Sequence, residues 1–326
     1  MTQLTPGKAR GLQACSTPQG VFAILAADHR DALRTIVNPD APETVPATRL
    51  TEVKLAVVQH LGPAASAVLL DPVYSAAQAI TGGQLPGNIG LLCAVEEQGY
   101  LGDPHQRQTS LIAGWSVAKT KRLGANGIKL LLFYNPEAGP STEAQEELVR
   151  RIAADCRRVD LPFFLEPIIY PTDSAIEKNS PEFAVQRPRL IVEMVRRLSC
   201  LGPDVMKIEF PVDVSYENDR AVWHDACAEV NQASQLPWTI LSGGGSFEIF
   251  KQQLRVACQA GCSGFVCGRS IWQEAAILHG QARRDFLKGL AYQRILDLRR
   301  IAEEEASPWQ ARLAVPSVNE QWYQQY

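Results

Sequence analysis

The stretch Asp204-Val205-Met206-Lys207-Ile208-Glu209-Phe210-Pro211-Val212 is the most informative part of the sequence. Its apolar, β-branched and aromatic residues, closed by proline, predict one buried strand. A lysine stands in the middle, and a buried ammonium needs a partner, access to water or a chemical task because its desolvation is costly. Side chains alternate along a strand, so Lys207 and Glu209 are expected to face the same space. They form either a salt bridge on a half-buried strand or part of a site.

Seven similar runs accompany this one along the chain. They predict strands at 21–27, 66–70, 90–95, 127–134, 162–169, 238–241 and 264–267. Helical patterns separate them at 47–61, 111–123, 141–158, 188–201, 219–234 and 247–260, and a longer helical region covers 271–305. Eight strands alternating with helices, without a composition break, predict an α/β fold in one domain. We expect a single (β/α)8 TIM barrel over residues 1–326, with an irregular tail from about 307.

Composition and charge narrow the class of protein. The 326 residues are 46% hydrophobic and 21% charged, as in an ordinary globular protein. The net charge of −3 offers no basic patch for nucleic acid. The first twenty residues lack a signal-peptide core, and no apolar run reaches the roughly 18 residues that a membrane span requires. We expect a cytoplasmic protein that binds neither nucleic acid nor membrane.

The eight cysteines are scattered through apolar patterns, which is typical of reduced, buried thiols. Cys258, Cys262 and Cys267 are close in sequence and raise the question of a metal cluster. They contain no C-x-x-C pair and have no histidine nearby, so we expect no metal site.

Three charged residues inside strands predict catalysis. Lys129, Glu166 and Lys207 occupy the fourth, fifth and sixth predicted strands, which are neighbours in a barrel and should bring the three groups together. Two lysines in one low-dielectric pocket would depress an amine pKa. A neutral lysine attacks a ketone to give a carbinolamine and then a protonated imine, with Glu166 as the proton shuttle. The alternative is an ion-pair network that only ties the strands together.

A second set of residues follows the seventh and eighth predicted strands. Ser242-Gly243-Gly244-Gly245 and Gly268-Arg269 occupy the loops where barrel enzymes commonly bind phosphate. Glycine lets backbone N–H groups approach the anion, and arginine offers a bidentate fork. A triple glycine also serves as a simple turn, but its pairing with Arg269 favours an anion site. A sulfonate would fit the same donors.

Asp28 closes the first strand and is a candidate for holding sugar hydroxyls. His29 and Arg30 are candidates to join it, and a hydrogen-bonded structural role is the alternative for His29. Asp71 and Glu96 end the second and third strands and are candidates for supporting groups.

Seven segments together resemble a known family, the class I tagatose-1,6-bisphosphate aldolases, from about residue 20 to Trp309. The segments are AADHR (26–30), LLDPVY (69–74), IKLL (128–131), FFLE (163–166), SPEFA (180–184), VMKIEFPV (205–212) and CGR (267–269). The resemblance implies a barrel lyase that splits a ketose bisphosphate into dihydroxyacetone phosphate and glyceraldehyde 3-phosphate without metal or another cofactor. It implies a homo-oligomer. It also assigns the imine to Lys207, acid/base work to Glu166, site roles to Lys129 and Asp28, and phosphate contacts to Ser242, Gly243 and Arg269.

The sequence is also similar to sulfofructose-1-phosphate aldolases, in the segments 165–167, 237–242 and 263–265. His29 departs from both groups, which typically carry glutamine there. The substrate therefore stays open between tagatose or fructose 1,6-bisphosphate and sulfofructose 1-phosphate, which would give sulfolactaldehyde. A metal-dependent class II aldolase would need clustered histidines, and the five here lie mostly on predicted helices or loops. A non-catalytic sugar-phosphate sensor would bind the same ligands and release no triose.

Overall fold

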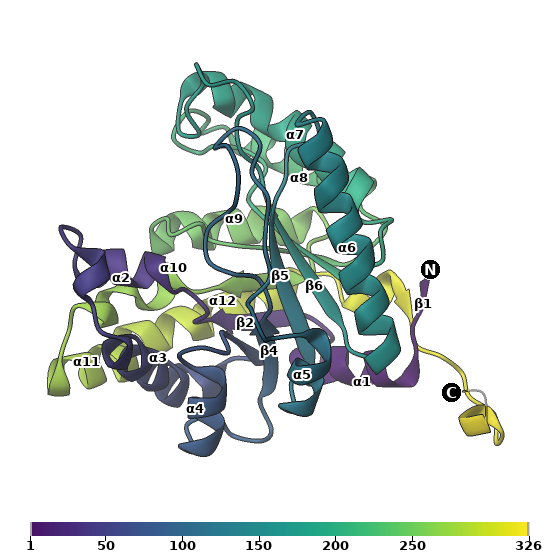
Figure 1. Ribbon diagram of the computed structural model, residues 1–326, viewed down its shortest axis with the longest axis horizontal. Helices are drawn as coiled ribbons and strands as arrows, with labels where there is room; N and C mark the ends of the chain where they lie inside the picture. Colours follow the sequence, from purple (N-terminus) through teal and green to yellow (C-terminus); the bar gives the residue numbers. More distant parts are fainter. Residues whose placement is uncertain (1, 325) are drawn as a thin grey trace.

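Eight parallel strands close into a barrel in chain order (Figure 1). The computed structural model describes residues 2–324 and 326. The barrel strands are β2 (Phe22–Ala26), β3 (Ala67–Leu70), β4 (Gly90–Ala94), β5 (Gly127–Phe133), β6 (Phe163–Ile168), β7 (Val205–Ile208), β8 (Trp238–Ile240) and β9 (Gly264–Cys267). Strand β2 pairs with β3 on one side and with β9 on the other, which closes the barrel. The predicted fold class is confirmed, although β7 ends at Ile208, four residues before the predicted end.

Helices surround the barrel (Figure 1). They are α1 (Pro6–Cys15), α2 (Asp31–Val37), α3 (Ala47–Leu61), α4 (Ala76–Thr81), α5 (Val117–Arg122), α6 (Pro140–Val159), α7 (Pro181–Leu198), α8 (Arg220–Ala233), α9 (Phe247–Gln259), α10 (Arg269–Trp272), α11 (Gly280–Phe286) and α12 (Tyr292–Glu305). A short pair of strands, β1 (Thr2–Gln3) and β10 (Leu313–Ala314), joins the two ends of the chain. Among the described residues, no helix has the length and apolar character needed to cross a bilayer.

Three predicted helical segments differ from the structure. The segment predicted at 111–123 is helical only in α5, which begins six residues later, because Leu111 forms an isolated antiparallel bridge with Glu96. Helix α7 begins at Pro181, seven residues before the predicted start, because the Ser180 hydroxyl accepts a hydrogen bond from the Phe183 N–H and caps the helix. Pro188, the predicted first residue, lies inside α7. The predicted helical region 271–305 is divided into α10, α11, a π-helical turn at Leu287–Ala291 and α12.

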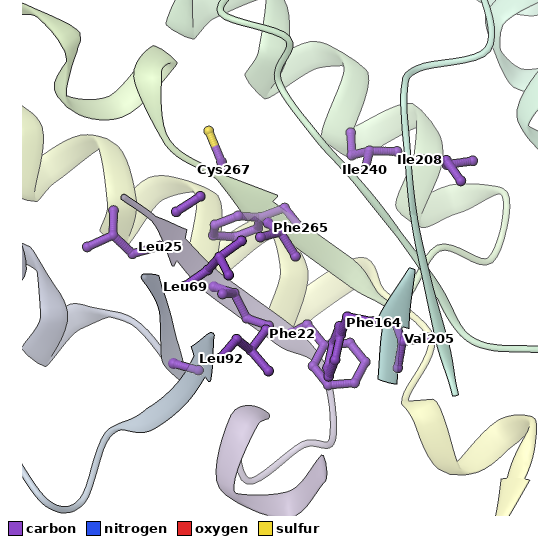
Figure 2. Close-up of a cluster of buried hydrophobic side chains, with 14 of the residues drawn as sticks. Phe22, Leu25, Leu69, Leu92, Phe164, Val205, Ile208, Ile240, Phe265 and Cys267 are labelled. Atoms are coloured by element: carbon purple, nitrogen blue, oxygen red, sulfur yellow. The ribbon is translucent and has the colours of Figure 1, made fainter. Parts of the chain in front are cut away.

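Buried apolar side chains of the barrel strands form a cluster (Figure 2), and its members Phe22, Phe164 and Val205 lie near the N-terminal ends of their strands. Phe22 on β2 and Phe164 on β6 come from opposite sides of the barrel, yet their rings meet edge to face with centroids 5.4 Å apart. Strand side chains alternate in direction, so Glu166 faces the same way as Phe164, two residues earlier. Lys207 follows Val205 in the same manner. The polar side chains of Glu166 and Lys207 therefore lie one layer closer to the C-terminal end of the barrel than the apolar side chains of Phe164 and Val205.

Helix α1 packs against the N-terminal ends of the strands. A Cβ atom on Gly11 would lie only 2.5 Å from the Asn126 carbonyl oxygen just before β5, so this close approach requires glycine. Lys8 of α1 forms a buried ion pair with Asp204, at 2.8 Å between Nζ and Oδ2. The same Oδ2 atom accepts a hydrogen bond from the Phe163 N–H at 2.8 Å. Helix α1 is thus joined to the starts of β6 and β7.

Candidate active site

A cavity of about 280 Å³ opens at the C-terminal ends of the barrel strands. Its lining combines buried carboxylates with basic side chains from strand ends and from the loops that follow them. The charged and histidine side chains that line it are Asp28, His29, Arg30, Glu96, Glu97, Lys129, Glu166, Lys178, Lys207, Glu209 and Arg269.

Lys129 on β5 lies among three carboxylates. Its Nζ atom is 2.9 Å from Asp28 Oδ2, 2.8 Å from Glu96 Oε1 and 2.7 Å from Glu166 Oε2. The other oxygen of Glu96 accepts a hydrogen bond from the Leu131 N–H, which fixes this carboxylate. Burial opposes the charged ammonium, but the three carboxylates outweigh it and hold the pKa of Lys129 well above its ordinary value. The expectation of a depressed amine pKa is therefore wrong for Lys129.

Lys207 on β7 has a different environment. Its Nζ atom lies 2.7 Å from Glu166 Oε1, and this is its one carboxylate contact within the described part of the chain. The structure thus brings together Lys129, Glu166 and Lys207, with Glu166 between the two ammonium groups. Glu209 lines the same cavity but contacts Lys178 and Arg187 instead, so the suggested Lys207–Glu209 salt bridge is absent from the described residues.

The pKa values of the two other carboxylates beside Lys129 are shifted in opposite directions. For Asp28, burial favours the neutral acid, but the charges of Lys129 and Lys207 lower its pKa below the ordinary value. For Glu96, burial wins and raises the pKa, even though Lys129 opposes it. Asp28 therefore keeps its negative charge to a lower pH than Glu96 does. Among residues 2–324 and 326, no group of three or more His, Cys, Asp or Glu side chains has a geometry that could hold a metal ion.

His29 and Arg30 both face the cavity. Burial lowers the pKa of His29 to about 3 against the pull of Asp28, whose Oδ1 lies 3.8 Å from the ring Nδ1, so the imidazole is neutral. The ring packs edge to face on Trp272, with centroids 5.6 Å apart. Arg30 donates to Glu97 at 3.0 Å and to the Glu96 carbonyl at 2.6 Å. Its guanidinium thus braces the loop after β4, a structural use that the sequence did not indicate.

The predicted anion-binding residues are distributed over two cavities. Gly243 and Arg269 line the cavity of Lys207, and Arg269 donates to the Gly243 carbonyl at 3.1 Å. Ser242 lines an adjoining cavity of about 230 Å³ that also includes Gly243. Gly244 lies under Arg269 at φ 90°, where a Cβ atom would lie 3.0 Å from the Arg269 Cζ atom.

Gly268 has a packing role. A Cβ atom there would lie 2.4 Å from the Ala26 carbonyl oxygen of β2. Neither Gly244 nor Gly268 lines either of these two cavities. The cavity linings therefore give no support for the phosphate contacts expected of Gly244 and Gly268. Both glycines instead allow close approach of neighbouring atoms in the loops after β8 and β9.

Asp71 does not line the cavity either. It forms a fully buried ion pair with Lys54 of α3, and its other oxygen accepts hydrogen bonds from the Val73 and Tyr74 N–H groups. Burial lowers the pKa of Lys54 against the attraction of Asp71. This pair fixes the turn after β3, so Asp71 has a structural role.

Sequence reasoning missed Lys178, which lies between β6 and α7 and lines the cavity. Its Nζ atom is 3.1 Å from Glu209 Oε1. The available signal was its position in a loop after a barrel strand, where functional groups gather. All eight cysteines are unpaired, and seven of them are buried.

Residues 22–274 match the family described as DeoC/LacD family aldolase. The chain is 33% identical to a tagatose 1,6-diphosphate aldolase 2 of Enterococcus faecalis, covering 97% of this chain and 99% of that protein. It is also 33% identical to a tagatose 1,6-diphosphate aldolase of Listeria monocytogenes, over 95% of each. Among solved structures, an archaeal fructose 1,6-bisphosphate aldolase superposes with a TM-score of 0.59 at 20% identity, covering 91% of this chain and 99% of that one. A fructose-bisphosphate aldolase from Slackia heliotrinireducens gives 0.60 at 17% identity, over 87% and 90%.

Proposed function

Because this chain belongs to the DeoC/LacD family of aldolases, we propose that it cleaves a phosphorylated ketose through an imine on Lys207. The family identifies a carbon–carbon lyase, as the sequence motifs predicted. The observation that carries the proposal is the position of Glu166, whose two oxygens each lie 2.7 Å from a different lysine.

The environments of the two lysines support Lys207 as the nucleophile. Lys129 is surrounded by carboxylates that stabilise its ammonium, and an ammonium has no lone pair for attack on a carbonyl. Lys207 contacts only Glu166 among the carboxylates of the described residues. Deprotonation of Lys207 therefore forfeits one ion pair, whereas deprotonation of Lys129 forfeits three. Lys129 acts in this scheme as a fixed positive charge.

The reaction follows from this arrangement. The free amine of Lys207 attacks the ketone carbon, and the carbinolamine loses water to form a protonated imine. Glu166 removes the proton of the hydroxyl on the far carbon of the bond to be broken, so that this carbon becomes the aldehyde carbonyl and the bond's electron pair moves into the imine to give an enamine. The aldehyde departs. Protonation of the enamine and hydrolysis of the imine release dihydroxyacetone phosphate, and we propose that no metal or other cofactor takes part.

The relatives named tagatose 1,6-diphosphate aldolase support a ketose 1,6-bisphosphate as the substrate. We propose tagatose or fructose 1,6-bisphosphate, with glyceraldehyde 3-phosphate as the aldehyde. Arg269 and the backbone near Gly243 would hold the phosphate of the dihydroxyacetone half, because both line the cavity and Arg269 has no carboxylate partner in the described part of the chain. Sulfofructose 1-phosphate remains the competing substrate.

Borohydride reduction in the presence of dihydroxyacetone phosphate, followed by peptide mass spectrometry, tests the mechanism. We expect one adduct, on Lys207, and none in a Lys207→Met variant. An adduct on Lys129 would reverse the assignment of the two lysines. Ligand binding without an adduct, and without release of triose from tagatose, fructose or sulfofructose phosphates, would favour the sensor. The homo-oligomeric state and the cytoplasmic location stay predictions, and sedimentation velocity would test the first.

A further inference from the structure

The basic side chains of the cavity differ in how completely carboxylates neutralise them. Lys129 contacts three carboxylates, and Arg30 is held by Glu97 and a backbone carbonyl. His29 is neutral at ordinary pH. If Lys207 forms the imine, two cations remain to contact a substrate, Arg269 and Lys178.

Lys178 belongs to a cluster with excess positive charge. Glu209 Oε1 lies 3.1 Å from Lys178 Nζ and 3.6 Å from Arg187 Nη2, so two cations share one carboxylate. The second oxygen of Glu209 accepts the Ile169 N–H at 3.0 Å, which fixes the carboxylate against the backbone after β6. Arg187 donates in addition to the Phe210 carbonyl. The Lys178 ammonium is therefore held in place without being neutralised.

The cavity consequently has an acidic centre and two basic ends. Asp28, Glu96 and Glu166 surround Lys129 at the centre. Arg269 follows β9 and Lys178 follows β6, so Lys207 on β7 lies between them in the barrel order. The Lys178 side chain is 32% exposed, which leaves donors free to contact a ligand. This polarity matches a chain of hydroxyl-bearing carbons with an oxyanion at each end.

We propose that Lys178, positioned by Glu209, is the binding group for a tetrahedral oxyanion at the aldehyde end of the substrate. The inference rests on the proposed function and adds a residue that selects the substrate. A phosphate and a sulfonate share the chemistry that an ammonium recognises, so each is a candidate oxyanion.

Aldol addition of dihydroxyacetone phosphate to three aldehydes tests this subsite. Glyceraldehyde 3-phosphate carries a phosphate, sulfolactaldehyde carries a sulfonate, and glyceraldehyde carries no charge. The readout is the ratio of kcat/KM for each anionic aldehyde to that for glyceraldehyde, so the neutral aldehyde is an internal reference. We expect Lys178→Met to lower the ratio for the native aldehyde by about tenfold to a hundredfold, since a charge-assisted hydrogen bond is lost. Lys178→Arg should restore most of it.

The matched control is Lys251→Met. Lys251 on α9 also forms a 3.1 Å ion pair, with Asp297, and its side chain is 27% exposed, but it does not line the cavity. Its loss should leave all ratios within twofold. The anionic aldehyde with the higher ratio in the unsubstituted chain identifies the oxyanion as phosphate or sulfonate.

Borohydride trapping with dihydroxyacetone phosphate alone separates the two ways of failing. An adduct on Lys207 together with an unchanged ratio in Lys178→Met would overturn the Lys178 subsite and leave the proposed function standing. Failure of the unsubstituted chain to form the adduct would overturn the proposed function and, with it, the subsite.

Discussion

The Oε1 atom of Glu166 lies 2.7 Å from the Nζ atom of Lys207, and both side chains are almost fully buried. The opposite oxygen of Glu166 meets Lys129 at the same distance. A single carboxylate thus contacts the proposed nucleophile on one side and a fixed ammonium on the other. Glu166 can therefore act through its negative charge and through its capacity to accept a proton.

Replacing Glu166 by glutamine keeps the size of the side chain and removes its ability to accept a proton. We expect kcat for ketose bisphosphate cleavage to fall by about 10²- to 10⁴-fold, the usual contribution of general acid–base catalysis. The Lys207 adduct should still form during long incubation with dihydroxyacetone phosphate and borohydride. Glu97→Gln is the control, because Glu97 lines the cavity but pairs with Arg30. Cleavage by Glu166→Gln within threefold of the parent rate would exclude Glu166 as the shuttle.

Lys129→Met should destabilise the protein more than Lys207→Met does. Removing Lys129 leaves Asp28 and Glu96 buried without their ammonium partner, a loss of about 3–5 kcal/mol in the free energy of unfolding. Removing Lys207 leaves Glu166 still paired with Lys129. Urea unfolding of the two variants measures the difference. Equal stabilities would show that the three contacts of Lys129 contribute no more than the single contact of Lys207.

His29→Gln should make the protein less sensitive to acid. The imidazole takes up a proton near pH 6.5 in the unfolded chain but only near pH 3 in the folded one, because burial lowers its pKa. The unfolded state therefore binds more protons as the pH falls below about 6.5, and the folded state loses stability over that range. The melting temperature of the parent should drop further between pH 7 and pH 5 than that of His29→Gln. Parallel decreases in the two proteins would contradict a neutral buried His29.

Lys8→Met should lower stability without changing the rate constant. Its ion pair with Asp204 is buried at the end of the barrel away from the cavity, so its loss should cost about 3–5 kcal/mol while kcat stays within twofold. The control is Arg150→Met, because Arg150 is half exposed and its contacts with Glu146 and Glu147 span 3.4 Å. An exposed pair of this kind contributes about 0–1 kcal/mol. If Lys8→Met lowered the free energy of unfolding as little as Arg150→Met, the Lys8–Asp204 ion pair would not be what holds α1 to the barrel.

The barrel could be predicted because its signals are local. The runs at 66–70, 127–134 and 264–267 are apolar and bounded by turn residues, and the corresponding strands differ by at most one residue at each end. The start of α7 was wrong because two prolines compete for its first turn, and only the Ser180 cap decides in favour of Pro181. The short helices α1, α2 and α4 were missed because helices of ten residues or fewer have weak periodicity.

The site was partly predictable because the positions of its residues on the strands are also local signals. Strand order places Lys129, Glu166 and Lys207 together, and the structure agrees. The number of carboxylates at each ammonium depends on side-chain geometry across strands, and no spacing in the sequence encodes it. The high pKa of Lys129 could therefore not be foreseen. Lys178 was missed because its proposed role depends on Glu209, a partner 31 residues away.

Packing at the N-terminal end of the barrel leaves the C-terminal end as the route for substrate and products. The rings of Phe22 and Phe164 meet inside the barrel near that end (Figure 2). Helix α1 packs against the same end, whereas the cavity opens at the C-terminal ends of the strands. In the proposed mechanism the dihydroxyacetone phosphate half is still attached to Lys207 when the aldehyde is freed. The aldehyde must therefore exit first, in an ordered sequence with one substrate and two products. Dihydroxyacetone phosphate should then inhibit competitively against the ketose, and the aldehyde should inhibit noncompetitively.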